Sequence, residues 1–169
     1  MRLFIAIPLS EKMKQSVADT QGAFRFRGVR GNYTPEENLH VTLAFIGEYG
    51  DSNAVLDALE EVSFTPFRIK MAGVGYFDDL WWVGFEENEA LQNLAMKVRR
   101  TLSDAGIPFD KKRFKAHVTI LRQAVFTRDR GINVGVDSTE MEVDHIALMC
   151  STRGKHGMIY TEIGGVEAK

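Results

Sequence analysis

Two stretches decide the fold: LHVTLAFIG at residues 39–47 and KAHVTILRQ at residues 115–123. Each contains His-Val-Thr followed by an aliphatic residue, starting at His40 and at His117, which are 117 − 40 = 77 residues apart. In an extended strand, alternate side chains point to opposite faces. Each His-Val-Thr motif therefore predicts a polar face with an imidazole and a hydroxyl, and an apolar face for the core. One copy in each half of the chain predicts two similar lobes that share a central cleft.

The segments around these two motifs alternate between strand and helix patterns. Apolar runs bounded by turn residues predict strands at residues 2–9, 39–47, 67–77, 80–86, 115–123, 141–151 and 157–165. Helical periodicity predicts helices at residues 10–24, 51–63 and 88–106. The basic, glycine-containing segment 25–38 predicts an exposed loop. Several connections between strands are too short for parallel crossovers, so the pattern favours an α+β fold with largely antiparallel sheets.

Length and composition indicate a globular protein with one domain. With 169 residues, 44% of them hydrophobic and 26% charged, the chain can bury a sizeable core, and residues 1–169 are expected to form a single two-lobed domain. The one cysteine, Cys150, excludes an internal disulfide, and its apolar surroundings predict a buried thiol. No apolar run reaches the roughly 18 residues of a membrane span. A cytoplasmic monomer without membrane contact is therefore expected.

Two imidazoles and two hydroxyls facing one cleft suit the cleavage of a phosphodiester without a metal. A neutral imidazole can take a proton from an attacking water, and a protonated one can give a proton to the departing alkoxide. Histidine suits both tasks because its ordinary pKa, about 6.5, lies near working pH. The hydroxyls of Thr42 and Thr119 can donate hydrogen bonds to the non-bridging phosphate oxygens. The pattern therefore predicts paired catalytic roles for His40 and His117.

Three other interpretations of the two motifs stay open. A single His-x-Thr motif is often a half-buried structural pair, although two copies among four histidines argue against that. A non-catalytic module that binds nucleotides or RNA would use the same cleft and would show binding without turnover. A metal site on the two histidines is disfavoured because Thr42 and Thr119, rather than Asp, Glu or Cys, stand two residues after them.

Basic and aromatic residues flank the two His-Val-Thr motifs. The net charge is −2, so any attraction to nucleic acid must come from a local patch. Such a rim is predicted from Arg25, Arg27, Arg30, Lys111, Lys112, Arg113 and Lys115, with solvated loops as the alternative. Trp81 and Trp82 are adjacent and must face opposite sides of a strand, so one is expected in the core and the other is a candidate for stacking on a base. His145 and His156 lack a threonine two residues on and are expected to be structural or exposed.

The chain resembles the two-histidine (2H) phosphoesterases, and within them the bacterial and archaeal RNA 2′,3′-cyclic phosphodiesterases once called 2′-5′ RNA ligases. The segments that carry the resemblance are RLFIAI (2–7), ENLHVTLAFIGE (37–48), LWWVGF (80–85) and FKAHVTILR (114–122), with a C-terminal pattern of Ser151, Gly157 and Tyr160. They follow the family's order over nearly the whole chain. The chain departs from the family pattern at Ala116, where proline is common, at Leu121, where alanine is usual, and at Tyr33, in place of a tryptophan.

The resemblance implies an α+β fold with two lobes, outer helices and a cleft between the lobes, and it implies no metal or other cofactor. It also implies a substrate, which is RNA with a 2′,3′-cyclic phosphate end or a small cyclic nucleotide. The resemblance implies that the product is a 2′-phosphate, and that a reversible 2′-5′ RNA ligase activity can accompany the hydrolysis. The implied site residues are His40 as proton donor, His117 as proton acceptor, Thr42 and Thr119 as their motif partners, and Arg122 as a phosphate-binding residue.

Overall fold

The computed structural model describes residues 1–127 and 134–169. The strands are β1 Arg2–Pro8, β2 Arg30–Tyr33, β3 His40–Glu48, β4 Phe67–Phe77, β5 Leu80–Phe85, β6 His117–Val125, β7 Glu140–Val143, β8 His145–Gly154 and β9 Gly157–Glu167. The helices are α1 Glu11–Phe26, α2 Ser52–Leu59, α3 Glu89–Asp104 and the short 3₁₀ turn η1 Glu36–Asn38. None of the helices in the described ranges is long and apolar enough to cross a membrane.

The strands form two sheets, each with antiparallel neighbours. The first sheet has four strands in the order β3-β1-β8-β9, and the second has five in the order β2-β6-β5-β4-β7. The predicted α+β fold with two antiparallel lobes is therefore confirmed. The lobes do not coincide with the two halves of the sequence, however, because β8 and β9 join β1 and β3 in the first sheet.

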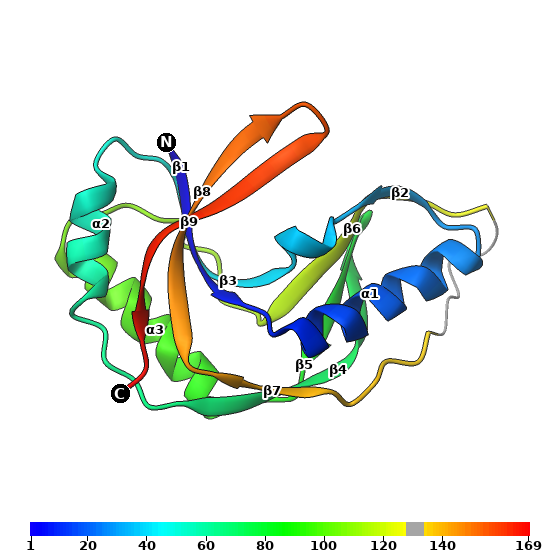
Figure 1. Cartoon of the computed structure of the whole chain (residues 1–169), viewed down its shortest axis with the longest axis horizontal. Helices are drawn as coiled ribbons and strands as arrows, with labels where there is room; N and C mark the ends of the chain where they lie inside the picture. Colours follow the sequence, from blue (N-terminus) through cyan, green and yellow to red (C-terminus); the bar gives the residue numbers. More distant parts are fainter. Residues whose placement is uncertain (128–133) are drawn as a thin grey trace.

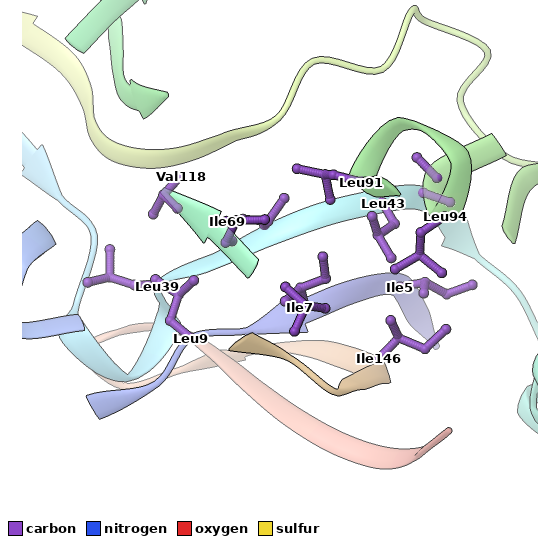
Figure 2. Packing of buried hydrophobic residues seen from close by; sticks show 14 of the residues in the cluster. Ile5, Ile7, Leu9, Leu39, Leu43, Ile69, Leu91, Leu94, Val118 and Ile146 are labelled. Atoms are coloured by element: carbon purple, nitrogen blue, oxygen red, sulfur yellow. The ribbon is translucent and has the colours of Figure 1, made fainter. Parts of the chain in front are cut away.

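The helices cover the outer faces of the two sheets. α2 packs against β9 and α3 against β3, on the first sheet, whereas α1 packs against β6 and β7 of the second (Figure 1). Figure 2 shows the packing under α3, where Leu91 and Leu94 of the helix lie near Ile5 and Leu43 of the first sheet. All four side chains are buried. Burial of apolar surface on this side of the first sheet leaves its other face for the cleft.

Two segments differ from the sequence prediction. The segment 25–38, predicted as a loop, contains β2, which pairs with β6, and the turn η1. The single strand predicted at 141–151 is two strands, since β7 pairs with β4 in the second sheet and β8 pairs with β1 in the first. The break falls at Asp144, whose carbonyl accepts a hydrogen bond from the Ala168 amide. The chain changes sheets there without a turn sequence that would reveal it.

Candidate active site

A cleft of about 920 Å³ is lined by side chains from both sheets. The strands β3 and β6, which carry the two His-Val-Thr motifs, contact each other at this cleft. The cleft lining includes all five side chains that the sequence singled out: His40, Thr42, His117, Thr119 and Arg122. The repeated His-Val-Thr motif thus supplies two imidazoles and two hydroxyls to one cleft.

A bulge in β6 explains how Arg122 comes to face the cleft. In a regular strand, Arg122 would share a face with Val118 and Ile120, because side chains alternate. However, Thr119 pairs with Trp82 and Leu121 pairs with Trp81, so one residue of β6 has no partner between them. Ile120 and Leu121 are both fully buried, and the alternation is shifted by one position beyond them. Arg122 therefore lies on the same face as Thr119.

The same irregularity occurs at the matching place in β3. Thr42 pairs with Ala6 and Ala44 pairs with Ile5, which leaves Leu43 without a partner on β1. Leu43 and Ala44 are both fully buried. The next residue, Phe45, lines the cleft. The two motif strands are thus alike in their bulge as well as in their sequence, and Phe45 stands where β6 has its arginine.

Each imidazole is held through its Nδ1 by a backbone carbonyl two residues earlier. The Nδ1 of His40 lies 2.7 Å from the carbonyl oxygen of Asn38, and the Nδ1 of His117 lies 2.6 Å from that of Lys115. A carbonyl oxygen only accepts, so Nδ1 carries the hydrogen and donates it. This fixes the tautomer of the neutral ring and leaves Nε2 of both residues to accept or deliver a proton. The Nε2 of His40 lies 2.8 Å from the hydroxyl oxygen of Thr42.

Aromatic side chains enclose both imidazoles. The ring of His40 has its centroid 4.9 Å from that of Phe4 and 5.4 Å from that of Tyr160, the latter in an edge-to-face arrangement. The ring of His117 lies 6.2 Å from that of Trp82. The other tryptophan, Trp81, is buried in the core, so the two tryptophans face opposite sides as predicted. These rings reduce the contact of the imidazoles with water, and both histidines line the cleft.

Burial and nearby cations both lower the pKa of the two histidines. For His40, loss of solvation has the largest effect and lowers the pKa, the hydrogen bond to Asn38 partly opposes it, and the charges of His117 and Arg122 lower the pKa further. For His117, loss of solvation again dominates, opposed by the hydrogen bond to Lys115, and the charges of Lys115 and Arg122 lower the pKa further. Both imidazoles therefore favour the neutral form more than a free histidine does.

The predicted basic rim corresponds only in part to the cations of the cleft. Of its seven residues, Lys112 is the one that lines the cleft in the described structure, while Arg25 instead lies over the ring of Tyr33 at 4.1 Å. Two arginines that the sequence reasoning missed, Arg2 and Arg153, line the cleft from β1 and β8. For Arg2 a signal was present, since it shares the alternation of RLFIAI with the cleft residue Phe4.

The remaining histidines lie outside the cleft lining. His145 is placed 3.2 Å from a carboxylate oxygen of Glu162 and 2.9 Å from one of Glu167, and His156 is exposed in the turn between β8 and β9. Within residues 1–127 and 134–169, no three His, Cys, Asp or Glu side chains gather into a group that could hold a metal ion. Cys150 is buried and free, as predicted.

Known proteins match this chain in sequence and in fold. The sequence model of LigT-like phosphoesterases matches residues 7–80 and 83–160. An RNA 2′,3′-cyclic phosphodiesterase of Archaeoglobus fulgidus is 37% identical over 130 residues, covering 72% of each chain. Another, of Aquifex aeolicus, is 36% identical over 155 residues, covering 80% of each chain.

The fold has solved counterparts as well. A crystal structure of a Thermus thermophilus protein superposes with a TM-score of 0.83 at 29% identity, over 99% of this chain and 97% of that one. The crystal structure of Escherichia coli LigT complexed with 3′-AMP superposes with a TM-score of 0.87 at 23% identity, over 99% and 97% of the two chains, and shows the likeness of the fold. Together with the match over residues 7–80 and 83–160, these likenesses establish that the chain belongs to the LigT-like phosphoesterase family, the two-histidine phosphoesterases.

Proposed function

We propose that this protein is an RNA 2′,3′-cyclic phosphodiesterase that opens a terminal 2′,3′-cyclic phosphate to a 2′-phosphate. The observation that carries the proposal is the pair of imidazoles in one cleft, each with Nδ1 tied to a carbonyl and Nε2 available. The relatives in Archaeoglobus fulgidus and Aquifex aeolicus, which carry that name, support the choice of substrate. A monomeric state and a cytoplasmic location stay predictions.

The reaction uses the two imidazoles in opposite protonation states. Nε2 of His117 takes a proton from a water molecule, whose oxygen attacks phosphorus. The bond from phosphorus to the ribose 3′-oxygen breaks, and Nε2–H of His40 gives its proton to that oxygen. Attack and departure are in line on opposite sides of phosphorus. One water is consumed, the phosphate stays on the 2′-oxygen, and the two histidines exchange protonation states.

The neighbouring polar groups hold the phosphate during this step. The hydroxyls of Thr42 and Thr119 donate hydrogen bonds to the non-bridging oxygens, where negative charge is concentrated. The guanidinium of Arg122 adds a positive charge close enough to lower the pKa of both imidazoles. The same charge attracts a phosphate bound beside them. The cleft thus supplies an acid, a base and three groups that bind the anion.

The proposed function is tested with a short RNA that ends in a 2′,3′-cyclic phosphate, incubated with the protein and EDTA. We expect turnover without added metal. The product is then digested with a phosphatase specific for 3′-phosphates, and resistance to that enzyme is expected because the phosphate stays on the 2′-oxygen. Absence of turnover refutes the proposed function, and release of phosphate from most of the product reverses the roles of the two ribose oxygens.

The pH dependence of kcat/KM follows from the lowered pKa of both imidazoles. The active free enzyme has one neutral and one charged histidine, and its population peaks between the two pKa values of the coupled pair. Because burial lowers both below the ordinary 6.5, we expect a bell-shaped profile with its maximum below about pH 6.5. Initial rates measured at low substrate concentration from about pH 4.5 to about pH 8.5, where histidines titrate, give this profile. A maximum above about pH 7 would contradict the expected shift of the profile to lower pH.

Replacing Arg122 with glutamine is expected to raise KM or lower kcat about tenfold or more, because a charge-assisted contact to phosphate is lost. The product stays a 2′-phosphate, since the histidines keep their places. Arg100→Gln is the matched control: it removes the same charge from the exposed surface of α3, away from the cleft. A change in the product isomer, or an equal loss in the control, argues against a phosphate-binding role for Arg122.

A further inference from the structure

The matching bulges of β3 and β6 reveal an asymmetry in the charges of the cleft. Arg122 follows Thr119 by three residues, and Phe45 follows Thr42 by the same spacing. The first lobe thus has an aromatic ring where the second has a guanidinium. The guanidinium carbon of Arg2, on the neighbouring strand β1, lies 5.1 Å from the centroid of the Phe45 ring. A cation is therefore present on this side too, held by the ring and supplied by another strand.

Two further cations, Lys112 and Arg153, line the same cleft. Arg2 pairs with Ser151 across β1 and β8, and Arg153 is two residues beyond Ser151 on the same face. Arg2 and Arg153 are thus diagonal neighbours on the cleft side of the first sheet. Lys112 also lines the cleft, and the nearby amide of Asp110 donates a hydrogen bond to the carbonyl of Phe45. We call Arg2, Lys112 and Arg153 the distal cations.

Among the described residues, the carboxylate that stands opposite a distal cation is that of Glu48, which pairs with Arg2 across β1 and β3 without forming an ion pair with it. Two acidic residues, Glu48 and Asp110, also line the cleft. The carboxylate of Glu48 lies 3.4 Å from the amino group of Met1, and that of Asp110 accepts a hydrogen bond from the backbone amide of Lys112 at 2.9 Å. Within the described ranges, no distal cation forms an ion pair with a side chain. Unpaired cations around a cavity favour an anionic ligand.

On its own strand, Arg2 is well separated from the residues that face the reacting phosphate. Ala6 of β1 pairs with Thr42, and Arg2 is four residues earlier on the same strand. At a rise of about 3.3 Å per residue, the backbone of Arg2 is roughly 13 Å from that of Ala6. Arg122, in contrast, lies close enough to lower the pKa of both imidazoles, and the distal cations are not among the charges that do so. The cleft volume of about 920 Å³ is near the upper end of the roughly 300–1,000 Å³ that small-molecule sites occupy.

We propose that Arg2, Lys112 and Arg153 form a second phosphate subsite, which holds the phosphodiester on the 5′ side of the terminal nucleotide. The preferred substrate is then an RNA strand of at least two nucleotides rather than a cyclic mononucleotide. This inference rests on the proposed function and adds to it the part of the substrate that the distal end of the cleft binds. Phe45 fixes one guanidinium at this subsite, whereas Thr42 and Thr119 serve the reacting phosphate.

Three substrates with the same terminal nucleotide test the subsite. They are a nucleoside 2′,3′-cyclic phosphate, a dinucleotide with the same cyclic end, and that dinucleotide with a neutral methylphosphonate linkage. We expect kcat/KM for the charged dinucleotide to exceed that for the mononucleotide by about tenfold or more, as for a charge-assisted contact to phosphate. The neutral linkage is expected to remove most of that preference. In the double variant Arg2→Gln/Arg153→Gln, the ratio of dinucleotide to mononucleotide is expected to fall toward one.

Arg100→Gln/Lys97→Gln is the matched control, since it removes two positive charges from the exposed side of α3, and it is expected to keep the wild-type ratio. A ratio near one in the wild type, an equal preference for the neutral linkage, or a full preference in the double variant overturns the subsite and leaves the proposed function standing. Turnover of none of the three substrates overturns both. If the double variant does not fold, the wild-type comparison of charged and neutral linkages still decides.

Discussion

Replacing either His40 or His117 with alanine is expected to lower kcat about 10²- to 10⁴-fold, because one proton transfer then proceeds without a positioned acid or base. Stability should change little in comparison, since both rings are only half-buried and face the cleft rather than the core. Turnover of an RNA with a 2′,3′-cyclic phosphate end gives the rates, and thermal unfolding followed by circular dichroism gives the stability.

His156→Ala is the matched control for these two variants. It removes an imidazole from the exposed turn between β8 and β9, outside the cleft lining, and is expected to keep near-native kcat. A folded His40→Ala or His117→Ala protein with near-native kcat would disprove the two-histidine mechanism. A comparable loss in His156→Ala would show that the effect is not specific to the cleft.

Replacing Thr42 or Thr119 with valine is expected to lower kcat about 10²-fold or more each, the cost of removing one donor to a developing oxyanion. Valine keeps the branched shape that suits a strand, so the backbone of β3 and β6 should be preserved. KM is expected to change less than kcat if the hydrogen bond strengthens as charge develops in the transition state.

Serine in place of each threonine is the control, because it restores the hydroxyl without the methyl group. Thr42→Ser and Thr119→Ser are expected to recover most of the lost kcat. The Thr42 hydroxyl also lies 2.8 Å from Nε2 of His40, so the losses of Thr42→Val and His40→Ala should combine by less than their product. Valine variants with wild-type kcat would show that the hydroxyls do not contact the reacting phosphate.

The cleft residues could be predicted from the sequence to the extent that strand alternation holds. His40 with Thr42, and His117 with Thr119, are two apart within regular stretches of β3 and β6, so alternation alone placed each pair on one face. Arg122 breaks that alternation and was identified through the family pattern. Its orientation depends on the unpaired Ile120 opposite the Trp81–Trp82 step of β5, and sequence periodicity does not reveal the register of a neighbouring strand.

The arrangement of the lobes was less accessible to sequence reasoning. The antiparallel α+β class followed from short connections, and α3, predicted at 88–106, is observed at Glu89–Asp104 because its apolar stripe is regular. The entry of β8 and β9 into the first sheet is a long-range pairing that no local pattern encodes. Alternation with Phe4 indicates the face of β1 on which Arg2 lies, but the approach of Arg2 to Phe45 depends on the pairing of β1 with β3.

The assignment of donor and acceptor is the central claim, and the pH profiles of kcat/KM for the two single-alanine variants test it most directly. In His40→Ala the general acid is absent and only the base titrates, so the rate is expected to rise with pH to a plateau. In His117→Ala only the acid titrates, so the rate is expected to fall from a plateau at low pH. Bell-shaped profiles in both variants, or the two profiles interchanged, would contradict the assignment of His40 as proton donor and His117 as proton acceptor.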